Sequence, residues 1–407
     1  MIISKKSIIL ILLSVFIVNT AAIIVYTYIP RYLLFLGMEK PLMQFIITIF
    51  PFTAFVFPPL YGYYSDKIQN RYIFILFGTI GMTFSYFFLF LTQNLILIVL
   101  LLFLFGFFMA SSNLLMTLFA ELVEDDKTFI SYINASIVAG WFVGAQSGGI
   151  FIDFYTIEHI FLLILLISLP NIFLVIFIRE ERALILERYN KVVEKNSNDL
   201  ILINIEDEIS ISNSIFYGLF FRNFSIKPIM PILAIIMNFH LGSDSEIGFL
   251  IGINFLLQFF QMLLVGKIIT LKNIKSFMII GYLLSSISIF GYIISSNFWS
   301  YLLFQVLVSF SYSMHWGATI TYIAQNTTPK NKGKFIGYAN SSVFSGSFIG
   351  GILFSLLLSV FNSDYYIVMY FMIIFPVIST IIVFLKFKPN QNLTISSKKG
   401  RDSELLH

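Results

Sequence analysis

Long apolar segments alternate with short polar loops along the chain. Each segment has about 20 residues or more, the length that a helix needs to cross about 30 Å of hydrocarbon. The segments are continuously apolar rather than alternating every second residue, which favours helices over membrane-spanning strands. Twelve are predicted, at 7–29, 41–64, 72–92, 95–120, 129–152, 159–178, 215–239, 246–265, 276–296, 299–324, 335–360 and 365–386. The pattern therefore predicts an all-α integral membrane protein, with twelve transmembrane helices in two six-helix bundles.

Polar stretches divide the chain further. One long stretch separates the sixth and seventh segments, and another follows the twelfth. We expect an N-terminal six-helix bundle at 1–178, a cytoplasmic linker at 179–213, a C-terminal six-helix bundle at 214–388 and a disordered cytoplasmic tail at 389–407. The first segment follows a short basic stretch, as a signal peptide does. Its apolar run is longer than the about 7–15 residues of a signal core, so we expect a retained helix.

Composition narrows the classes of function. Of the 407 residues, 58% are hydrophobic and 11% are charged, whereas a soluble domain has about 25% charged residues. The chain has no Cys and four His, so thiol catalysis, metal centres and cofactors are not expected. A membrane-embedded enzyme would group carboxylates or metal ligands, and the one dense acidic group, at 124–126, has no His beside it. The sequence has no P-loop, which argues against direct use of ATP. We therefore expect a protein that is not an enzyme.

The positions of Lys and Arg predict how the chain is threaded. If the N-terminus is cytoplasmic, only Arg31 and Lys40 of the 25 basic residues fall on the outer side. Arg222 and Lys227 lie within or beside the seventh segment, and all the others fall on the cytoplasmic side, as the positive-inside rule requires. We therefore expect a multi-pass protein of the cell membrane with both termini in the cytoplasm. The net charge of +4 reflects this topology, and no nucleic-acid partner is expected.

An internal repeat relates the two bundles. Half of the sixteen positions from 129 to 144 are identical to the residues 206 positions later. The two stretches occupy the fifth and the eleventh segments, the same place in each half. The bundles are therefore expected to be parallel repeats, related by a pseudo-twofold axis along the membrane normal. Two similar bundles that face each other can rock about a central site, and this motion is alternating access.

The loop between the second and third segments carries a motif. Gly62, Asp66, Lys67 and Arg71 resemble the G-x-x-x-D-R/K-x-G-x-R/K loop of the major facilitator superfamily, although Gln69 replaces its second glycine. The twelve segments, the linker and this loop together resemble that superfamily over essentially the whole chain. The resemblance implies a secondary transporter, in which the four matching residues form a cytoplasmic gate. The alternative is a turn whose charges only set the topology.

Glycines recur in the fifth and eleventh segments. The stretch 140–149 is similar to the G-x-x-x-G-P-x-x-G-G pattern of drug and proton antiporters in this superfamily, with Ala145 in place of the proline. Glycines four residues apart form a groove in which another helix packs closely. The glycines expected to pack helices are Gly140, Gly144, Gly148, Gly149, Gly346 and Gly350. The pattern favours export over import, although the eleventh segment has the same spacing without the antiporter signature.

Polar residues within the predicted helices are candidates for a substrate site. The resemblance places the first and fourth helices of each half around a cavity, and the eighth helix adds two amides. The candidates are Asn19, Tyr26, Asn113, Lys227, Asn254, Gln258, Tyr312, His315 and Trp316. Lys227 is the most informative, because a charge in the membrane is costly unless it is paired or hydrated. Pro228 and Pro231 predict a broken helix whose free carbonyls, or the substrate, would meet the lysine.

Energy coupling has several candidate routes. His315 is a candidate carrier of a coupling proton, or a buried side chain hydrogen-bonded to Tyr312. Every acidic residue lies in a loop or at a segment end, which argues against coupling through a buried carboxylate. Exchange of one substrate for another and facilitated diffusion are the alternatives to coupling through His315. We expect a monomer in the lipid bilayer that moves a small-molecule substrate and exports lipophilic or amphiphilic compounds. The alternative is import of a sugar or an organic acid.

Overall fold

The computed structural model describes residues 5–123, 127–178, 211–327 and 329–388, and all the regular structure in these ranges is helical. Most of the predicted linker and all of the predicted tail lie outside the described residues. The first half contains α1 (Lys5–Phe35), α2 (Lys40–Ile47), α3 (Ile49–Ile68), α4 (Arg71–Leu91), α5 (Leu95–Met109), η1 (Ala110–Ser112), α6 (Asn113–Leu122), α7 (Lys127–Tyr155), η2 (Ile157–His159) and α8 (Ile160–Ile176). The second half contains α10 (Ser214–Ile229), η3 (Met230–Ile232), α11 (Leu233–Asn238), α12 (Asp244–Ile268), α13 (Ile274–Ile294), α14 (Phe298–Gln325), α15 (Pro329–Val360), α16 (Tyr365–Met372) and α17 (Ile374–Lys386).

These elements form twelve membrane-spanning units, as the hydropathy pattern predicts. Short breaks divide four of the units, so α2 with α3, α5 with α6, α10 with α11, and α16 with α17 each make one span. Eleven of the spans in the described ranges are long and apolar enough to cross a bilayer by length and composition alone. The remaining span, α14, has 28 residues but carries several buried polar side chains. They are Gln305, Ser309, Ser311, Ser313, His315 and Thr319.

The two halves repeat the same packing. In the first half, α7 packs along α1 and a Cβ added to Gly144 would overlap the carbonyl group of Thr20. In the second half, α15 packs along α10 and a Cβ added to Gly350 would overlap the carbonyl group of Phe224. Helices approach this closely only where one of them lacks a side chain. The repeat in the sequence therefore corresponds to a repeated helix pair in the fold.

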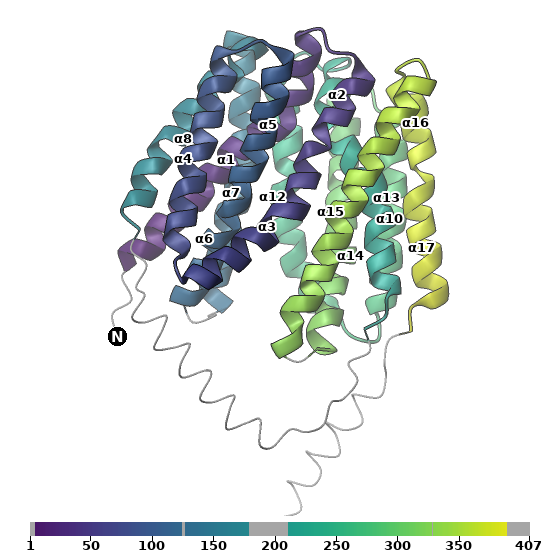
Figure 1. Ribbon diagram of the computed structural model, residues 1–407. Coiled ribbons are helices and arrows are strands. Elements are labelled where there is room, and N and C mark those ends of the chain that lie inside the picture. Colours follow the sequence, from purple (N-terminus) through teal and green to yellow (C-terminus); the bar gives the residue numbers. More distant parts are fainter. Residues whose placement is uncertain (1–4, 124–126, 179–210, 328, 389–407) are drawn as a thin grey trace, which may run out of the picture.

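The two ends of the molecule differ (Figure 1). The end drawn at the top is called the sealed face here, and it contains the helix ends at Phe35, Lys40, Tyr155, Asp244 and Val360. The other end, where α1 begins, is called the terminal face, and it contains the helix ends at Ile68, Leu122, Ile268, Gln325 and Lys386. The halves diverge toward the terminal face, where α3 and α6 lie apart from α14 and α15 (Figure 1).

Contacts between the halves are concentrated toward the sealed face. Along the α7–α12 pair, a Cβ at Gly149 or Gly248 would overlap a carbonyl oxygen of the other half, and the rings of Trp141 and Phe255 meet at 5.0 Å. Glycines nearer the terminal face, such as Gly266 on the same α12, have open space around the position of a Cβ. The halves therefore close on one side and separate on the other.

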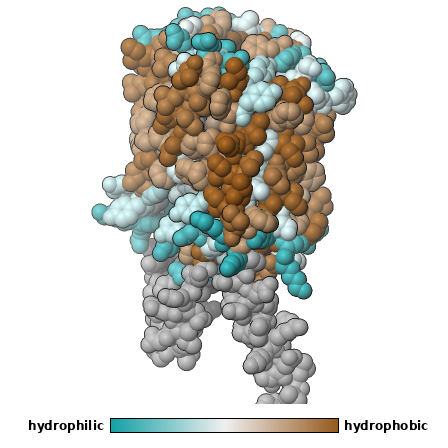
Figure 2. Space-filling model, turned by 90° about the vertical axis from the view of Figure 1, so that its right-hand side faces the viewer, coloured by the Kyte–Doolittle hydropathy of each residue, from teal (hydrophilic) through white to brown (hydrophobic). Residues whose placement is uncertain are grey.

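An apolar surface surrounds the molecule between its two ends. Figure 2 shows a brown hydrophobic band over the middle of the helices, with teal hydrophilic residues above and below it. Large apolar side chains within the membrane-spanning helices, such as Phe84, Phe173 and Leu303, are more than half exposed. Such exposure suits hydrocarbon rather than water, because a soluble monomer rarely exposes large contiguous apolar patches. The surface therefore supports the membrane location that the sequence predicts.

Candidate functional site

A recess of about 230 Å³ lies where the two halves meet. The first half contributes side chains of α1, α2 and α3 to its lining, and the second half contributes α10, η3 and α15. The lining residues are Tyr26, Gln44, Ile47, Thr48, Pro51, Lys227, Pro228, Pro231, Ser347 and Gly351. The recess brings together two of the predicted substrate residues, Tyr26 from α1 and Lys227 from α10. These two helices are the first spans of their respective halves.

The predicted break in this helix is present at η3, just after Lys227, whereas Lys227 itself is helical and not displaced from helical geometry as Pro228 suggested. Helix α10 runs through Lys227 and Pro228 to Ile229, and only then does the 3₁₀ turn η3 divert the chain before α11. The fixed φ of proline is itself helical, so its ring can be accommodated with the loss of one hydrogen bond and a local bend. The carbonyl of Pro228 accepts a hydrogen bond from the Gln44 side chain of the other half, at 3.2 Å.

The charge of Lys227 has no counterpart nearby. Among the described residues its amine has no hydrogen bond and no ion pair, and the three ion pairs found there do not include it. The side chain lines the recess instead. A second cation, Arg222, lies five residues earlier on the same helix and is 3% exposed. From the sequence, Arg222 is one of the charges within or beside the seventh span and not a predicted site residue, although a charge at this depth is itself a signal of function.

Hydroxyl and amide groups surround the Arg222 guanidinium. It donates from Nε to Ser285 Oγ at 3.0 Å and from Nη1 to Asn223 Oδ1 at 3.1 Å. The guanidinium carbon lies 5.9 Å from the ring centroid of Tyr312, a predicted substrate residue on α14. No carboxylate takes part in these contacts, so the site in the second half holds a cation in neutral polar surroundings.

Three aromatic residues lie beside this cation on α14. His315 is 1% exposed, and its Nδ1 is 2.6 Å from the Ser311 carbonyl oxygen. The expected hydrogen bond to Tyr312 is replaced by this backbone contact, and the Tyr312 ring meets the imidazole edge-on. The rings of Tyr312 and Trp316 lie nearly parallel, with centroids 6.2 Å apart. Three predicted residues thus form one cluster with Arg222.

The two predicted amides of α12 form a separate network. Asn254 donates to the Gln305 side chain at 2.8 Å and to its backbone carbonyl at 3.0 Å, and Gln258 donates to Asn254 Oδ1. Tyr292 also donates to Gln305 Oε1, at 3.2 Å. The network ties α12 to α13 and α14 within one half. Gln305 is not among the residues predicted from the sequence, although a polar side chain inside the predicted span 299–324 could have identified it.

The remaining candidates of the first half stay apart from the recess. Asn19 donates to the Val15 carbonyl at 2.8 Å, and Asn113 donates to the Ala110 carbonyl at 3.1 Å. Both amides therefore fold back onto their own stretch of chain. The structure does not bring either one into contact with Lys227 or with the aromatic cluster.

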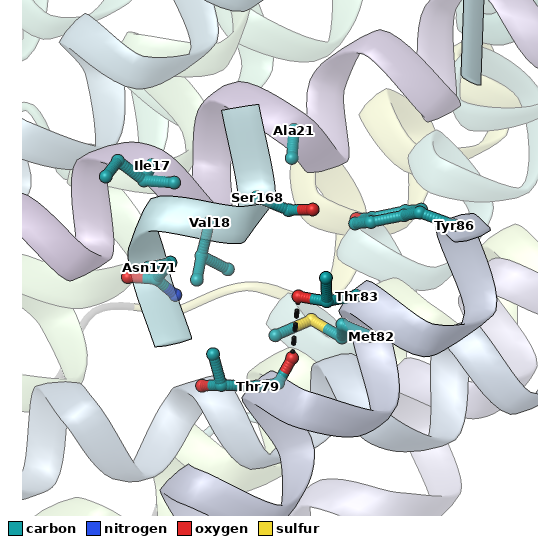
Figure 3. Close-up of a pocket in the computed structure, with 9 residues that line it drawn as sticks. All are labelled: Ile17, Val18, Ala21, Thr79, Met82, Thr83, Tyr86, Ser168 and Asn171. Carbon is teal, nitrogen blue, oxygen red and sulfur yellow. Dashed lines mark hydrogen bonds between the residues drawn. The ribbon is translucent and has the colours of Figure 1, made fainter. Parts of the chain in front are cut away.

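A second recess of about 220 Å³ lies inside the first half, between α1, α4 and α8 (Figure 3). Thr79, Thr83 and Ser168 point toward it, but each hydroxyl donates to a carbonyl of its own helix. Asn171 Oδ1 is buried without a hydrogen-bond partner. Because all its walls belong to one half, relative motion of the halves would not open this recess.

Polar contacts cross between the halves at the sealed face. Arg31 forms an ion pair with Asp244, the first residue of α12. Asp153, near the end of α7, accepts hydrogen bonds from the backbone N–H groups of Asp244 at 2.7 Å and Ser245 at 2.9 Å. A carboxylate at a helix N-terminus satisfies free N–H groups and interacts favourably with the helix dipole. One half thus caps a helix of the other.

Lys40 makes a similar contact on the other side of this face. Its amine donates to the Ser363 carbonyl at 3.1 Å and lies 4.7 Å from the ring centroid of Tyr365. Ser355 of α15 also donates to the Pro41 carbonyl, at 2.7 Å. Arg31 and Lys40, the only two basic residues expected on the outer side, therefore both bind the opposite half.

The loop motif at the terminal face makes its described contacts within the first half. Arg71 binds Asp66 at 3.0 Å and both carboxylate oxygens of Glu121 on α6, at 2.5–3.0 Å. Asp66 lies in the last turn of α3, and the following helix is capped by Asn70, which accepts a hydrogen bond from the Ile73 N–H. Lys67 is exposed, and a Cβ at Gly62 would meet no atom within 4 Å.

The predicted packing glycines lie at helix contacts. Gly140 faces the backbone of α1 at Phe16, and Gly148 faces the Tyr28 ring. Gly346 faces the Phe220 carbonyl of α10, which repeats the arrangement of the first half. Gly149 differs from these, because it faces Asp244 of the other half. A single segment therefore packs its own bundle and also seals the interface between bundles.

The fold and the central recess place this protein in the class of polytopic helical proteins that are built from two repeated six-helix bundles. A family model described as the Major Facilitator Superfamily matches residues 8–195 and 215–406. The chain belongs to this superfamily of transporters. No curated protein matches the sequence.

Several solved structures share the fold. A structure of the nucleoside transporter NupG aligns with a TM-score of 0.73 at 11% identity, covering 94% of this chain and 100% of that one. A D-xylose–proton symporter aligns with a TM-score of 0.71 at 13% identity, covering 95% and 98%. The POT family transporter PepTSo aligns with a TM-score of 0.72 at 11% identity, covering 94% and 97%. At identities this low, the similarity shows a shared fold and does not identify a substrate.

Proposed function

We propose that this protein is a secondary transporter that moves small molecules by alternating access. The supporting observation is the asymmetry between its ends, since the halves contact each other toward the sealed face and diverge toward the terminal face. A transporter needs a second state in which these contacts break and the terminal ends meet. The recess with Tyr26 and Lys227 lies at the interface that such a motion would open and close.

The terminal face is proposed to be cytoplasmic, in the cell membrane. The supporting observation is the location of the basic residues, because Arg31 and Lys40 are the only Lys or Arg in the described ranges that fall at the sealed face. The structure would then be the inward-open state. In the opposite state, Asp66, Lys67 and Arg71 are proposed to bind the second half and act as a cytoplasmic gate. An antibody epitope appended to the C-terminus should be protected in intact cells, and detection without permeabilisation would contradict this orientation.

Export of amphiphilic compounds is the favoured direction and cargo. The supporting features are aromatic rings beside the recess, where Tyr26 meets Phe50 at 5.6 Å and Phe50 meets Phe105 at 6.0 Å. Import of a sugar or an organic acid is the alternative, supported by the polar groups of Gln44 and Lys227. The protein is proposed to work as a monomer, and His315 stays a candidate for proton coupling.

A reversible cross-link tests the alternating motion. The chain has no native Cys, so a Leu42→Cys/Val360→Cys variant would carry only the two introduced thiols, one from each half at the sealed face. A thermal-shift screen of drugs, sugars and organic acids identifies a bound compound, and counterflow of that compound is then measured in proteoliposomes. Oxidation with a bifunctional thiol reagent should abolish counterflow, and a reducible reagent should allow recovery. Unchanged counterflow in fully cross-linked protein would contradict the proposal.

A further inference from the structure

Helix α10 places two positive charges inside the membrane-spanning part of the protein. Arg222 and Lys227 are five residues apart, which corresponds to about 7.5 Å along a helix axis. Both belong to the span Ser214–Asn238, and neither lies in its first or last turn. Charged side chains at such depth are rare, costly and concentrated in substrate pathways.

The described residues supply no negative charge to balance them. The acidic side chains in the described ranges lie near the two faces, for example Glu121 toward the terminal face and Asp153 toward the sealed face. The ion pairs in those ranges use Arg31 and Arg71 as their cations. Arg222 interacts with neutral groups only, and Lys227 lines the recess without a hydrogen-bond partner among the described residues.

The remaining donors suit an oxyanion. A guanidinium has five N–H donors in a planar fork, and the hydrogen bonds to Ser285 and Asn223 occupy two of them. The three donors of the Lys227 amine, which lines the recess, match the oxygens of a carboxylate, and the positive charge of Arg222 on the same helix attracts the same anion. The walls of the recess include the Tyr26 ring and the Gln44 amide. Together with the Lys227 amine, these groups suit a compact molecule with one charged end and an apolar or aromatic body.

We propose that the cargo of this transporter is a small organic acid, whose carboxylate is bound by Lys227 at the recess, while the buried charge of Arg222 on the same helix adds to the attraction. The assignment rests on the proposed transport function and specifies its substrate class. It also reconciles the amphiphilic cargo with the polar recess, because an aromatic or aliphatic acid has both features. The first half contributes no charge to this site, so recognition of the anion depends on α10.

Three matched probes test the charge requirement. Each probe has one phenyl ring. Benzoate carries a carboxylate, phenyl phosphate carries a phosphate, and benzyl alcohol carries a neutral hydroxyl group. Binding to purified full-length protein in nanodiscs is measured by thermal shift and by calorimetry. Benzoate should bind at least tenfold more tightly than benzyl alcohol. Equal affinity would overturn the anion proposal, and tighter binding of phenyl phosphate would overturn the choice of carboxylate.

Variants locate the site. Lys227→Met removes the charge but keeps the length of the side chain, and it should reduce the preference for benzoate over benzyl alcohol at least fivefold. Arg222→Gln should do the same, whereas Lys227→Arg should retain the preference. Lys272→Met removes an exposed charge from the α12–α13 loop and should change nothing. A preference that survives in both Lys227→Met and Arg222→Gln would overturn the proposal.

Failure of this proposal can be told apart from failure of the transport proposal. If the cross-link at Leu42 and Val360 blocks counterflow but benzoate shows no preference, transport stands and the acid cargo is wrong. If benzoate binds with the expected preference but the cross-link has no effect, the anion site stands and alternating access is wrong.

Discussion

The two faces of the molecule use charged residues in opposite ways. At the sealed face, Arg31 and Asp153 of the first half both bind the beginning of α12 in the second half. At the terminal face, Arg71 binds Glu121 and Asp66, which belong to its own half. Charges at the first face therefore hold the halves together, whereas those at the second brace the end of one half.

The difference indicates which contacts stabilise the state in which the sealed face is closed. Opening the sealed face must break the ion pair of Arg31 and the cap that Asp153 forms on α12, and it must separate the glycine contacts of α7 and α12. The described ion pairs at the terminal face lie within one half, so the same motion breaks none of them. The balance between the two states should therefore be sensitive to substitutions at the sealed face and less sensitive to those at the motif loop.

The largest effect is expected from Gly248→Val. A side chain at this position would overlap the Ala145 carbonyl of the other half, so the sealed face could not close. The rate at which a maleimide labels a reporter cysteine, placed at Gln146 of α7, should rise more than tenfold. Gly266→Val is the matched control on the same helix, because its Cβ would meet no atom within 4 Å. Equal labelling rates in the two variants would contradict the account of the seal.

A smaller effect is expected from Asp153→Asn. The substitution weakens two hydrogen bonds to the N-terminus of α12, and loss of a helix cap costs about 1 kcal/mol. The rate of labelling of a cysteine at position 146 should rise about fivefold, because a free-energy change of about 1 kcal/mol changes an equilibrium constant about fivefold. Glu158→Gln is the control, because Glu158 accepts a hydrogen bond from Gln93 within the same half. A similar rise in both variants would mean that charge loss alone, rather than the cap, is responsible.

The ion pair between Arg31 and Asp244 should contribute about 0.5–1 kcal/mol, since both side chains are partly exposed. Arg31→Gln should therefore increase labelling about two- to fivefold, and the effect should shrink as salt is raised. In a double-mutant cycle with Asp244→Asn, the second substitution should add little to the first. Full additivity of the two effects would show that the pair contributes no coupling.

The smallest effect on the sealed face is expected from Asp66→Asn. Its side chain is 66% exposed, and Arg71 keeps both oxygens of Glu121 as partners. Labelling of the cysteine at Gln146 should stay within twofold of the parent protein. Transport should nevertheless slow while substrate affinity is unchanged, because the loop is proposed to bind the second half in the opposite state. Unchanged turnover would count against that gate.

Much of the fold could be predicted from hydropathy, because bilayer thickness fixes the length of a spanning helix. The predicted span 72–92 agrees with α4, and 276–296 agrees with α13 within two residues at each end. The span 299–324 agrees with α14 in spite of its polar residues, since Gln305 and Ser311 are buried against neighbouring helices rather than exposed to lipid.

The site could be predicted only in part. The cost of a membrane charge pointed to Lys227, and the structure does place it beside Tyr26 in a recess. The partners of Arg31 and Lys40 could not be predicted, because they lie 213 and 323 residues away along the chain. The break predicted from Pro228 and Pro231 is present at η3, but its position after Lys227 could not be predicted, because a proline does not determine by itself whether a helix breaks or continues.

Distances across both faces test alternating access most directly. Spin labels at Leu42 and Val360 report on the sealed face, and labels at Ile68 and Lys332 report on the terminal face. Both pairs join the α2–α3 span to α15, and double electron–electron resonance measures each distance in nanodiscs with and without benzoate. The account predicts two populations that change in opposite senses, so that the first pair lengthens when the second shortens. Distances that stay fixed, or that lengthen together, would contradict it.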